Sequence, residues 1–211
     1  MTDLPAPLRD KLARRTALVV VDMQNDFCAD GGYVSKLGRD PAACRAIVPK
    51  LSELIAAARA GGVPVYWLMA DYDQTAVPAA MRARQSEMGM AEVTCCARGS
   101  WGSAPFGVAP EAGEPVIVKH CYSGFAGTDL DQRLRQAGIE TLVFTGVQTN
   151  VCVESTLRDA HSHGYFPVLV SDCVASHMAA QHEATVANVR FLFGYVAEST
   201  QLEVEWCAAR P

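Results

Sequence analysis

Short apolar runs alternate with longer amphipathic stretches along most of the chain. Five of the runs have the length and composition of buried parallel strands; they are ALVVV at 17–21, VPVYWL at 63–68, PVIVK at 115–119, TLVFTG at 141–146 and FPVLVS at 166–171. Because helical patterns separate these runs, the sequence predicts an α/β fold, in which right-handed crossovers place helices on both faces of a parallel sheet.

Two of the amphipathic stretches carry helix start and stop signals. Residues 43–60 place their apolar side chains on one stripe and are followed by Gly61 and Gly62, which predicts a helix ending there. A second helix is predicted after Thr128, which is a suitable cap, and before Gly138.

The stretch 70–114 has no regular pattern, and Gly, Ser, Pro and Met are scattered through it. We expect a short helix and long loops here, and loops of this length in a compact domain are often functional. With 211 residues, of which 50% are hydrophobic, the chain is long enough for one substantial core. We therefore expect a single domain over residues 1–211.

Composition narrows the classes of function. A formal net charge of -5 argues against a nucleic-acid partner, because phosphate backbones attract clustered Lys and Arg. No run approaches the roughly 18 apolar residues of a membrane span, and the N-terminus lacks a secretory pattern, so we expect a cytoplasmic protein without membrane contact. The eight cysteines are expected to be reduced. The sequence contains no C-x-x-C motif, so structural zinc is not expected.

Three polar residues stand where predicted strands end. Asp22 directly follows the first run, Lys119 ends the third, and Cys152 lies in the turn GVQTNVC after the fourth. Since ligands bind beyond the carboxyl ends of parallel strands, one cleft would gather all three. Taken singly, each residue also has a common structural role: an Asp after a strand often forms a turn, a Lys is usually solvated, and a free Cys is often a small core residue.

Cys152 carries the most chemical information of the three. We expect a helix to begin just before it, capped by Thr149 or Asn150. A helix N-terminus and a nearby ammonium lower the pKa of a thiol, so the sequence predicts a nucleophile that is largely ionised at neutral pH. Backbone N–H groups of the same turn would receive the oxyanion of a tetrahedral intermediate.

Three segments resemble the isochorismatase-like cysteine hydrolases: VVVDMQNDFC at 19–28, VKHCYSGFAGTDLDQRL at 118–134 and GVQTNVCVESTLRDA at 146–160. Their order and separations also match, so the resemblance covers nearly the whole chain. It implies a three-layer α/β/α sandwich with a mainly parallel sheet of about six strands. It also implies a catalytic triad, a cis peptide bond before Gln148 and an oxyanion hole formed by two N–H groups; the triad is Asp22, Lys119 and Cys152, and the N–H groups are those of Gln148 and Cys152.

The resemblance further implies a mechanism without a cofactor. Cys152 would attack an amide carbonyl, Asp22 would take the thiol proton, and water would cleave the resulting thioester. Nicotinamidases of this family hold a metal with an Asp-x-His motif, but WLMADYDQTAVP at 67–78 has no histidine, so we expect no metal. The later histidines are expected to be surface or core residues; they are His161, His163, His177 and His182.

Within the family, the segments GGY, ARGSWG and YSGF are most similar to the ureide branch, which includes ureidoacrylate amidohydrolases, biuret and triuret hydrolases and N-carbamoylsarcosine amidase. A small planar amide or ureide substrate needs aromatic walls; the candidates are Phe27, Trp67, Trp101, Tyr122 and Phe125. Two positions depart from that branch, since Cys121 stands where Arg is usual and Gln148 replaces a small residue. The amide of Gln148 is a candidate partner for a carbamoyl group, which would favour neutral ureides such as biuret or triuret.

Other functions stay open at this point. The enzyme could cleave a different small amide, such as an N-carbamoyl amino acid or maleamate. The fold could instead serve as a binding module with a vestigial triad, or as a thiol-redox protein using Cys28 as a partner. Because relatives are usually dimers or tetramers, we expect a homodimer or homotetramer, in which a neighbouring subunit can complete the loops at 70–114.

Overall fold

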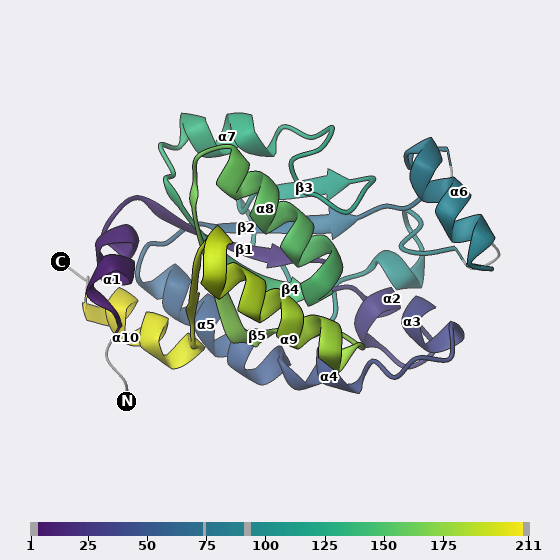
Figure 1. Cartoon of the computed structure of the whole chain (residues 1–211), viewed down its shortest axis with the longest axis horizontal. Helices are drawn as coiled ribbons and strands as arrows, with labels where there is room; N and C mark the ends of the chain where they lie inside the picture. Colours follow the sequence, from purple (N-terminus) through teal and green to yellow (C-terminus); the bar gives the residue numbers. More distant parts are fainter. Residues whose placement is uncertain (1–3, 74, 91–93, 209–211) are drawn as a thin grey trace.

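A computed structural model of the chain describes residues 4–73, 75–90 and 94–208. Its strands are β1 (Thr16–Val21), β2 (Val65–Ala70), β3 (Val116–Lys119), β4 (Thr141–Val147), β5 (Phe166–Ala175) and β6 (Tyr195–Ala197). They form one six-stranded sheet in the order β3-β2-β1-β4-β5-β6, and all neighbouring strands are parallel (Figure 1). The predicted α/β fold is confirmed. Only β6 was not predicted, because its three residues are too few to form an apolar run.

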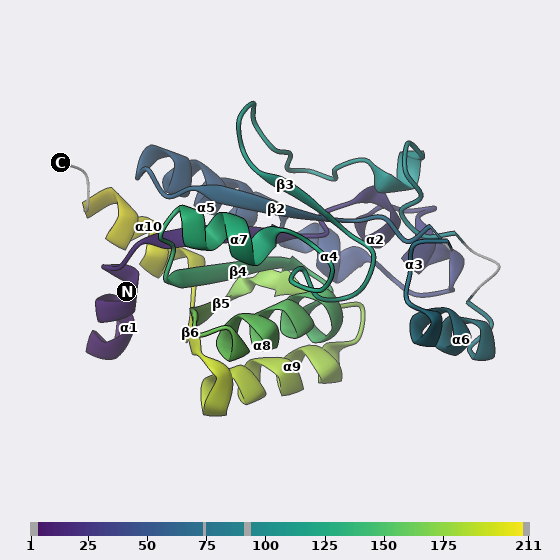
Figure 2. The same cartoon turned by 90° about the horizontal axis from the view of Figure 1, so that it is seen from above.

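Helices cover both faces of the sheet (Figure 2). The helices that pack on the two faces are α1 (Ala6–Leu12), α5 (Val48–Ala60), α7 (Leu130–Gln136), α8 (Glu154–Ser162), α9 (Ala179–Asn188) and α10 (Ser199–Ala208). Helices α1, α5 and α10 bury one core against Leu18 and Val20, while α7, α8 and α9 pack on the other face, against Val19 and Val21. Since successive side chains of a strand point to opposite faces, β1 is buried on both sides and forms the centre of the molecule.

The helix expected over 43–60 is divided in two. Helix α4 (Ala42–Ala46) is followed at once by α5, with the interruption at Ile47. Pro49 is the physical reason, because it has no N–H to donate to the carbonyl one turn earlier. The predicted stop is correct: α5 ends at Gly61, and Gly62 has a φ of 71°, in the left-handed region.

The N-cap of the second helix is Asp129, one residue after the predicted Thr128, but the Thr128 side chain does bond to the first turn. The Leu130 N–H donates to the Thr128 hydroxyl at 3.2 Å, at the start of α7. Two five-residue π-helical segments accompany the helices on this face: η2 (Thr149–Val153) leads into α8, and η3 (Val189–Phe193) follows α9.

Short elements surround the carboxyl ends of the strands, at the side of the molecule to which the arrows point in Figure 1. They are α2 (Asn25–Cys28), α3 (Tyr33–Lys36), α6 (Ala79–Glu87) and the 3₁₀ turn η1 (Trp101–Ser103). Gln24 ties the loops to β2, because its side-chain amide donates to the carbonyls of Ala70 and Ser103, both at 3.0 Å. As predicted, the described residues of the stretch 70–114 contain one α-helix, α6, together with the short turn η1, among loops.

Two further observations concern the helices and the cysteines. Within the three described ranges, no helix is both long enough and apolar enough to span a lipid bilayer. All eight cysteines lie in these ranges and are free thiols. The expectation of a reduced set is therefore met.

Candidate active site

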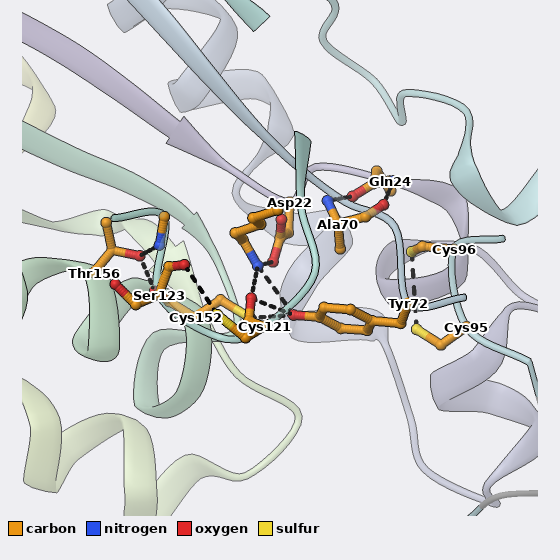
Figure 3. A network of polar contacts seen from close by, with 12 residues as sticks. Asp22, Gln24, Ala70, Tyr72, Cys95, Cys96, Cys121, Ser123, Cys152 and Thr156 are labelled. Carbon is orange, nitrogen blue, oxygen red and sulfur yellow. Dashed lines mark hydrogen bonds and ion pairs between the residues drawn. The ribbon is translucent and has the colours of Figure 1, made fainter. Parts of the chain in front are cut away.

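The three residues singled out at strand ends come together at one edge of the sheet. Lys119 is the last residue of β3, and its ammonium reaches past the end of β2 to the Asp22 carboxylate, with an Nζ–Oδ2 distance of 2.8 Å. Cys152 enters from η2, after β4. The side chains of Asp22 and Lys119 are fully buried, and Cys152 is only 3% exposed. Figure 3 shows Asp22 and Cys152 within the same polar network.

The backbone around Asp22 is tightly constrained. Asp22 has a φ of 50°, a left-handed conformation that Asp enters more readily than most residues. Next to it, Gly146 of β4 has a φ of 98°, and a Cβ there would lie 2.1 Å from the carbonyl oxygen of Val21. Only glycine therefore allows β4 to approach β1 this closely, one residue before the carboxylate.

The turn that carries Cys152 differs in part from its prediction. The peptide bond between Val147 and Gln148 is cis, as the family resemblance implied. However, neither expected side chain caps the helix: the Thr149 hydroxyl is 2.9 Å from His182 Nδ1, and the Asn150 carbonyl oxygen accepts from Ser176 at 2.7 Å. These side chains instead fasten the turn to the segments that follow β5.

Burial, rather than the helix terminus, dominates the ionisation of the thiol. Burial raises the pKa of Cys152 to about 12, the charge of Asp22 adds to this, and Lys119 opposes it. The expectation of a resting thiolate is therefore wrong, and the cysteine needs a base. Burial also raises the pKa of Asp22, against the attraction of Lys119. A carboxylate with a raised pKa is a better proton acceptor at neutral pH.

Lys119 stays charged in this setting. Burial disfavours its ammonium, yet Asp22 and Cys152 outweigh burial and hold the pKa of Lys119 above its usual value. The site at rest thus combines an ammonium, a carboxyl group and a neutral thiol.

A fourth polar group, the hydroxyl of Tyr72, joins the three residues. Lys119 Nζ donates to it at 3.0 Å, and Cys152 Sγ lies 3.2 Å from it. Tyr72 is not among the site residues predicted from the sequence. A signal was present, because Tyr72 follows β2 by two residues and parallel strands that end together bring such positions to one edge.

A cavity of about 200 Å³ opens onto Cys152. Its lining is mainly aromatic and aliphatic; the residues are Phe27, Tyr33, Val34, Leu37, Arg39, Tyr72, Gln85, Met88, Met90, Cys95, Tyr122, Gln148, Asn150, Val151, Cys152, His177 and Met178. Three of the expected substrate contacts are among them, namely Phe27, Tyr122 and Gln148. The lining includes one arginine and, among the described residues, no acidic side chain.

The other three aromatic candidates lie outside this cavity. Trp67 is buried in the core beneath β2, where its Nε1 donates to Glu114 at 2.7 Å. Trp101 is 56% exposed on η1, and Phe125 stacks on the His163 ring with centroids 4.9 Å apart. We therefore correct the expectation for Trp67, Trp101 and Phe125: none of them lines the wall beside Cys152.

Gln148 is already engaged by protein groups. Its side-chain oxygen accepts the His177 N–H at 3.0 Å and lies 3.1 Å from His177 Nδ1, and its Nε2 donates to Cys44 Sγ at 3.4 Å. His177, expected to be a surface or core residue, lines the cavity instead. Burial and Arg39 lower the pKa of His177, so its ring is neutral. Because Nδ1 then donates to Gln148, Nε2 is an acceptor.

One group of possible metal ligands occurs among the described residues. Ligand atoms of Asp26, Cys95 and Cys96 lie within 4.8 Å of one another, and all three residues are buried. The Asp26 carboxylate, however, accepts backbone N–H groups from Tyr33 at 3.0 Å and from Cys96 at 2.6 Å. These two hydrogen bonds explain the burial of the carboxylate without an ion.

A buried Asp–Lys ion pair beside a cysteine, at the carboxyl edge of a parallel sheet, is the arrangement expected of a cysteine hydrolase of the α/β class. The isochorismatase domain family matches residues 16–201 of the chain. The chain therefore belongs to the isochorismatase family.

Known proteins support this assignment. The chain is 38% identical over 204 residues to the ureidoacrylate amidohydrolase RutB of Methylobacterium radiotolerans, with 89% of this chain and 78% of that protein covered. A crystal structure of a cysteine hydrolase from Pseudomonas syringae pv. phaseolicola matches with a TM-score of 0.81 at 28% identity, over 93% of this chain and 94% of that one. N-carbamoylsarcosine amidase from Thermoplasma acidophilum matches with a TM-score of 0.71 at 30% identity, over 88% and 96%.

Proposed function

We propose that this chain is a cysteine-dependent amidohydrolase that cleaves a C–N bond of a small ureide or carbamoyl compound through a thioester. One observation carries the proposal: Cys152 lies at the wall of a small cavity, with the Asp22–Lys119 ion pair, 2.8 Å across, buried behind it. A purely structural cysteine would not need a buried carboxylate and ammonium beside it, since desolvating such a pair is costly.

The proposed reaction has two halves. In the first, Asp22 accepts the thiol proton and Cys152 attacks the carbonyl carbon, while the N–H groups of Gln148 and Cys152 receive the oxyanion. The intermediate collapses as Asp22 returns the proton to the departing nitrogen, which leaves a thioester. In the second half, Asp22 takes a proton from water, the hydroxide attacks the thioester, and the proton then returns to the released sulfur. Lys119 stabilises the negative charge on both neighbours throughout.

The cavity limits the substrate. About 200 Å³ admits a small molecule, and two of the enzymes to which the chain is similar carry ureidoacrylate and N-carbamoylsarcosine in their names. Aromatic side chains, Phe27 and Tyr122, would hold a planar ureide. The engaged amide of Gln148 weakens the case for a neutral ureide such as biuret or triuret.

One observation favours substrates that carry a carboxylate. Arg39 is the sole arginine or lysine among the described lining residues, and no carboxylate opposes it there. A guanidinium in this place suits ureidoacrylate or an N-carbamoyl amino acid, and it equally suits maleamate, which is the alternative amide outside the ureides.

Ammonia release over a panel of amides tests the proposed function. The panel contains ureidoacrylate, biuret, triuret, N-carbamoyl amino acids, nicotinamide and maleamate. We expect turnover of at least one ureide or carbamoyl compound, its loss in Cys152→Ala, and full activity in Cys207→Ala, which removes an exposed thiol on α10. Turnover that persists in Cys152→Ala would refute the mechanism.

We also propose a cytoplasmic homodimer or homotetramer of single-domain chains, on the strength of the family resemblance. Light scattering measures the assembly directly, and a mass of one chain in solution would contradict it.

A further inference from the structure

The hydroxyl of Tyr72 connects the buried ammonium to the sulfur. Lys119 Nζ donates hydrogen bonds to the Tyr72 hydroxyl at 3.0 Å and to the Cys121 carbonyl at 3.2 Å, and it lies 2.8 Å from Asp22 Oδ2 in the buried ion pair. The same hydroxyl lies 3.2 Å from Cys152 Sγ and is itself buried (Figure 3). The Tyr72 hydroxyl therefore contacts both the cation and the nucleophile.

Packing fixes the position of the Tyr72 ring. Phe27 and Tyr122 meet it edge to face, with centroids 6.5 Å and 6.3 Å away, and Lys119 Nζ lies 5.2 Å from the ring centroid. Only 3% of the residue is exposed. The ring cannot turn its hydroxyl toward solvent without disturbing these contacts.

The direction of the hydrogen bonds follows from the chemistry of the partners. An ammonium can only donate, so the Tyr72 oxygen accepts from Lys119 and its own hydrogen must go elsewhere. Two acceptors are within reach, the sulfur of Cys152 and the Cys121 carbonyl at 3.4 Å, and that carbonyl already accepts from Lys119. A thiol is a weak acceptor, whereas a thiolate is a strong one. The bond to sulfur therefore strengthens when the thiol loses its proton.

We propose that Tyr72 is a further catalytic residue, which donates a hydrogen bond to the Cys152 sulfur whenever that atom is negatively charged. This happens when Asp22 removes the thiol proton, and again when the sulfur leaves the thioester of the proposed reaction. Tyr72 transfers no proton: burial holds its pKa well above the usual value for a phenol, so it stays protonated. The hydrogen bond to the thiolate follows from the geometry alone. The hydrogen bond to the sulfur that leaves the thioester rests on the proposed function.

The role is tested without any substrate by alkylation of the thiol. Tyr72→Phe removes only the hydroxyl, and we expect iodoacetamide to modify Cys152 about 10- to 100-fold more slowly near neutral pH, with the modified peptide identified by mass spectrometry. Tyr66→Phe is the matched control, because Tyr66 is another buried tyrosine, on β2 itself, that belongs to the other core cluster from Tyr72 and does not line the cavity. The control should alkylate at the wild-type rate.

An unchanged alkylation rate in folded Tyr72→Phe would overturn the proposal. If that variant does not fold, 3-fluorotyrosine at position 72 keeps the ring and the hydroxyl while making the phenol a stronger donor. Alkylation should then become faster, and an unchanged or slower rate would count against the role. Failure of the proposed amidase activity is a separate outcome, since it appears in the ammonia assay and leaves the alkylation result intact.

Discussion

The ion pair between Lys119 and Asp22 is the residue-scale feature on which the site depends. Both side chains are fully buried, so each charge is tolerated only because the other stands 2.8 Å away. In the proposed mechanism the pair holds the acceptor of the thiol proton in place, at a considerable cost in desolvation.

Replacement of Lys119 by methionine should therefore affect both stability and turnover. The lone carboxyl of Asp22 would lose its partner, and we expect the free energy of unfolding to fall by about 3 to 5 kcal/mol, with turnover lost. Denaturant titration measures the first effect and the ammonia assay the second. As a control, Lys50→Met breaks the exposed ion pair with Asp172 and should leave both nearly unchanged. Equal effects of the two variants would contradict the assigned importance of the buried pair.

The pKa of Asp22 predicts the acid side of the activity profile. The carboxyl must be ionised to accept the thiol proton, so kcat/KM should fall as the pH drops through its pKa. Because burial raises that pKa, the fall should occur above the ordinary value of about 3.9 for an aspartate. A profile of kcat/KM against pH decides this, and activity that persists down to the ordinary aspartate pKa would argue against Asp22 as the base.

At the scale of elements, the contact between β1 and β4 sets the position of the carboxylate. Gly146→Ala would place a Cβ 2.1 Å from the Val21 carbonyl oxygen, at a φ of 98°. We expect a loss of about 3 kcal/mol or more in unfolding free energy, from the clash and the strained backbone together. Gly164→Ala is the matched control, since its φ is 90° and no atom lies within 4 Å of the added Cβ. Thermal or denaturant unfolding compares the two variants. If they are equally stable, the close approach of β4 to β1 is not the reason that position 146 needs glycine.

The sequence predicted most elements because their signals are local. Five strands and the helix after Thr128 follow from runs and caps that neighbouring residues determine. The errors arise where tertiary contacts compete with local preference. Thr149 and Asn150 are good capping residues, yet His182 and Ser176 engage their side chains instead.

In the site too, residues marked by local signals could be predicted, and residues placed by tertiary contacts could not. Asp22, Lys119 and Cys152 were found because strand ends and three extended motifs mark them. Trp67 was misplaced because strand alternation sends it to the face beneath β2, away from Cys152. His177 could not be placed in the cavity beforehand, because only the folded chain brings it to Gln148.

At the scale of the whole molecule, the fold gathers the polar groups on one side of the nucleophile and the apolar wall on the other. The buried ion pair lies behind Cys152, and the cavity in front, which Tyr72 also lines, is mainly aromatic and aliphatic. A carbonyl group entering the cavity would thus meet the sulfur in a site largely shielded from water, where electrostatic interactions are strong.

The most direct test is to look for the acyl group on the cysteine. Wild-type enzyme is mixed with a substrate found in the ammonia assay, quenched with acid during turnover, digested and examined by mass spectrometry. We predict that the peptide containing Cys152 gains the mass of the acyl fragment, and that this adduct disappears when the substrate is exhausted. Turnover with no adduct on that peptide, or with the adduct on another residue, would contradict the account.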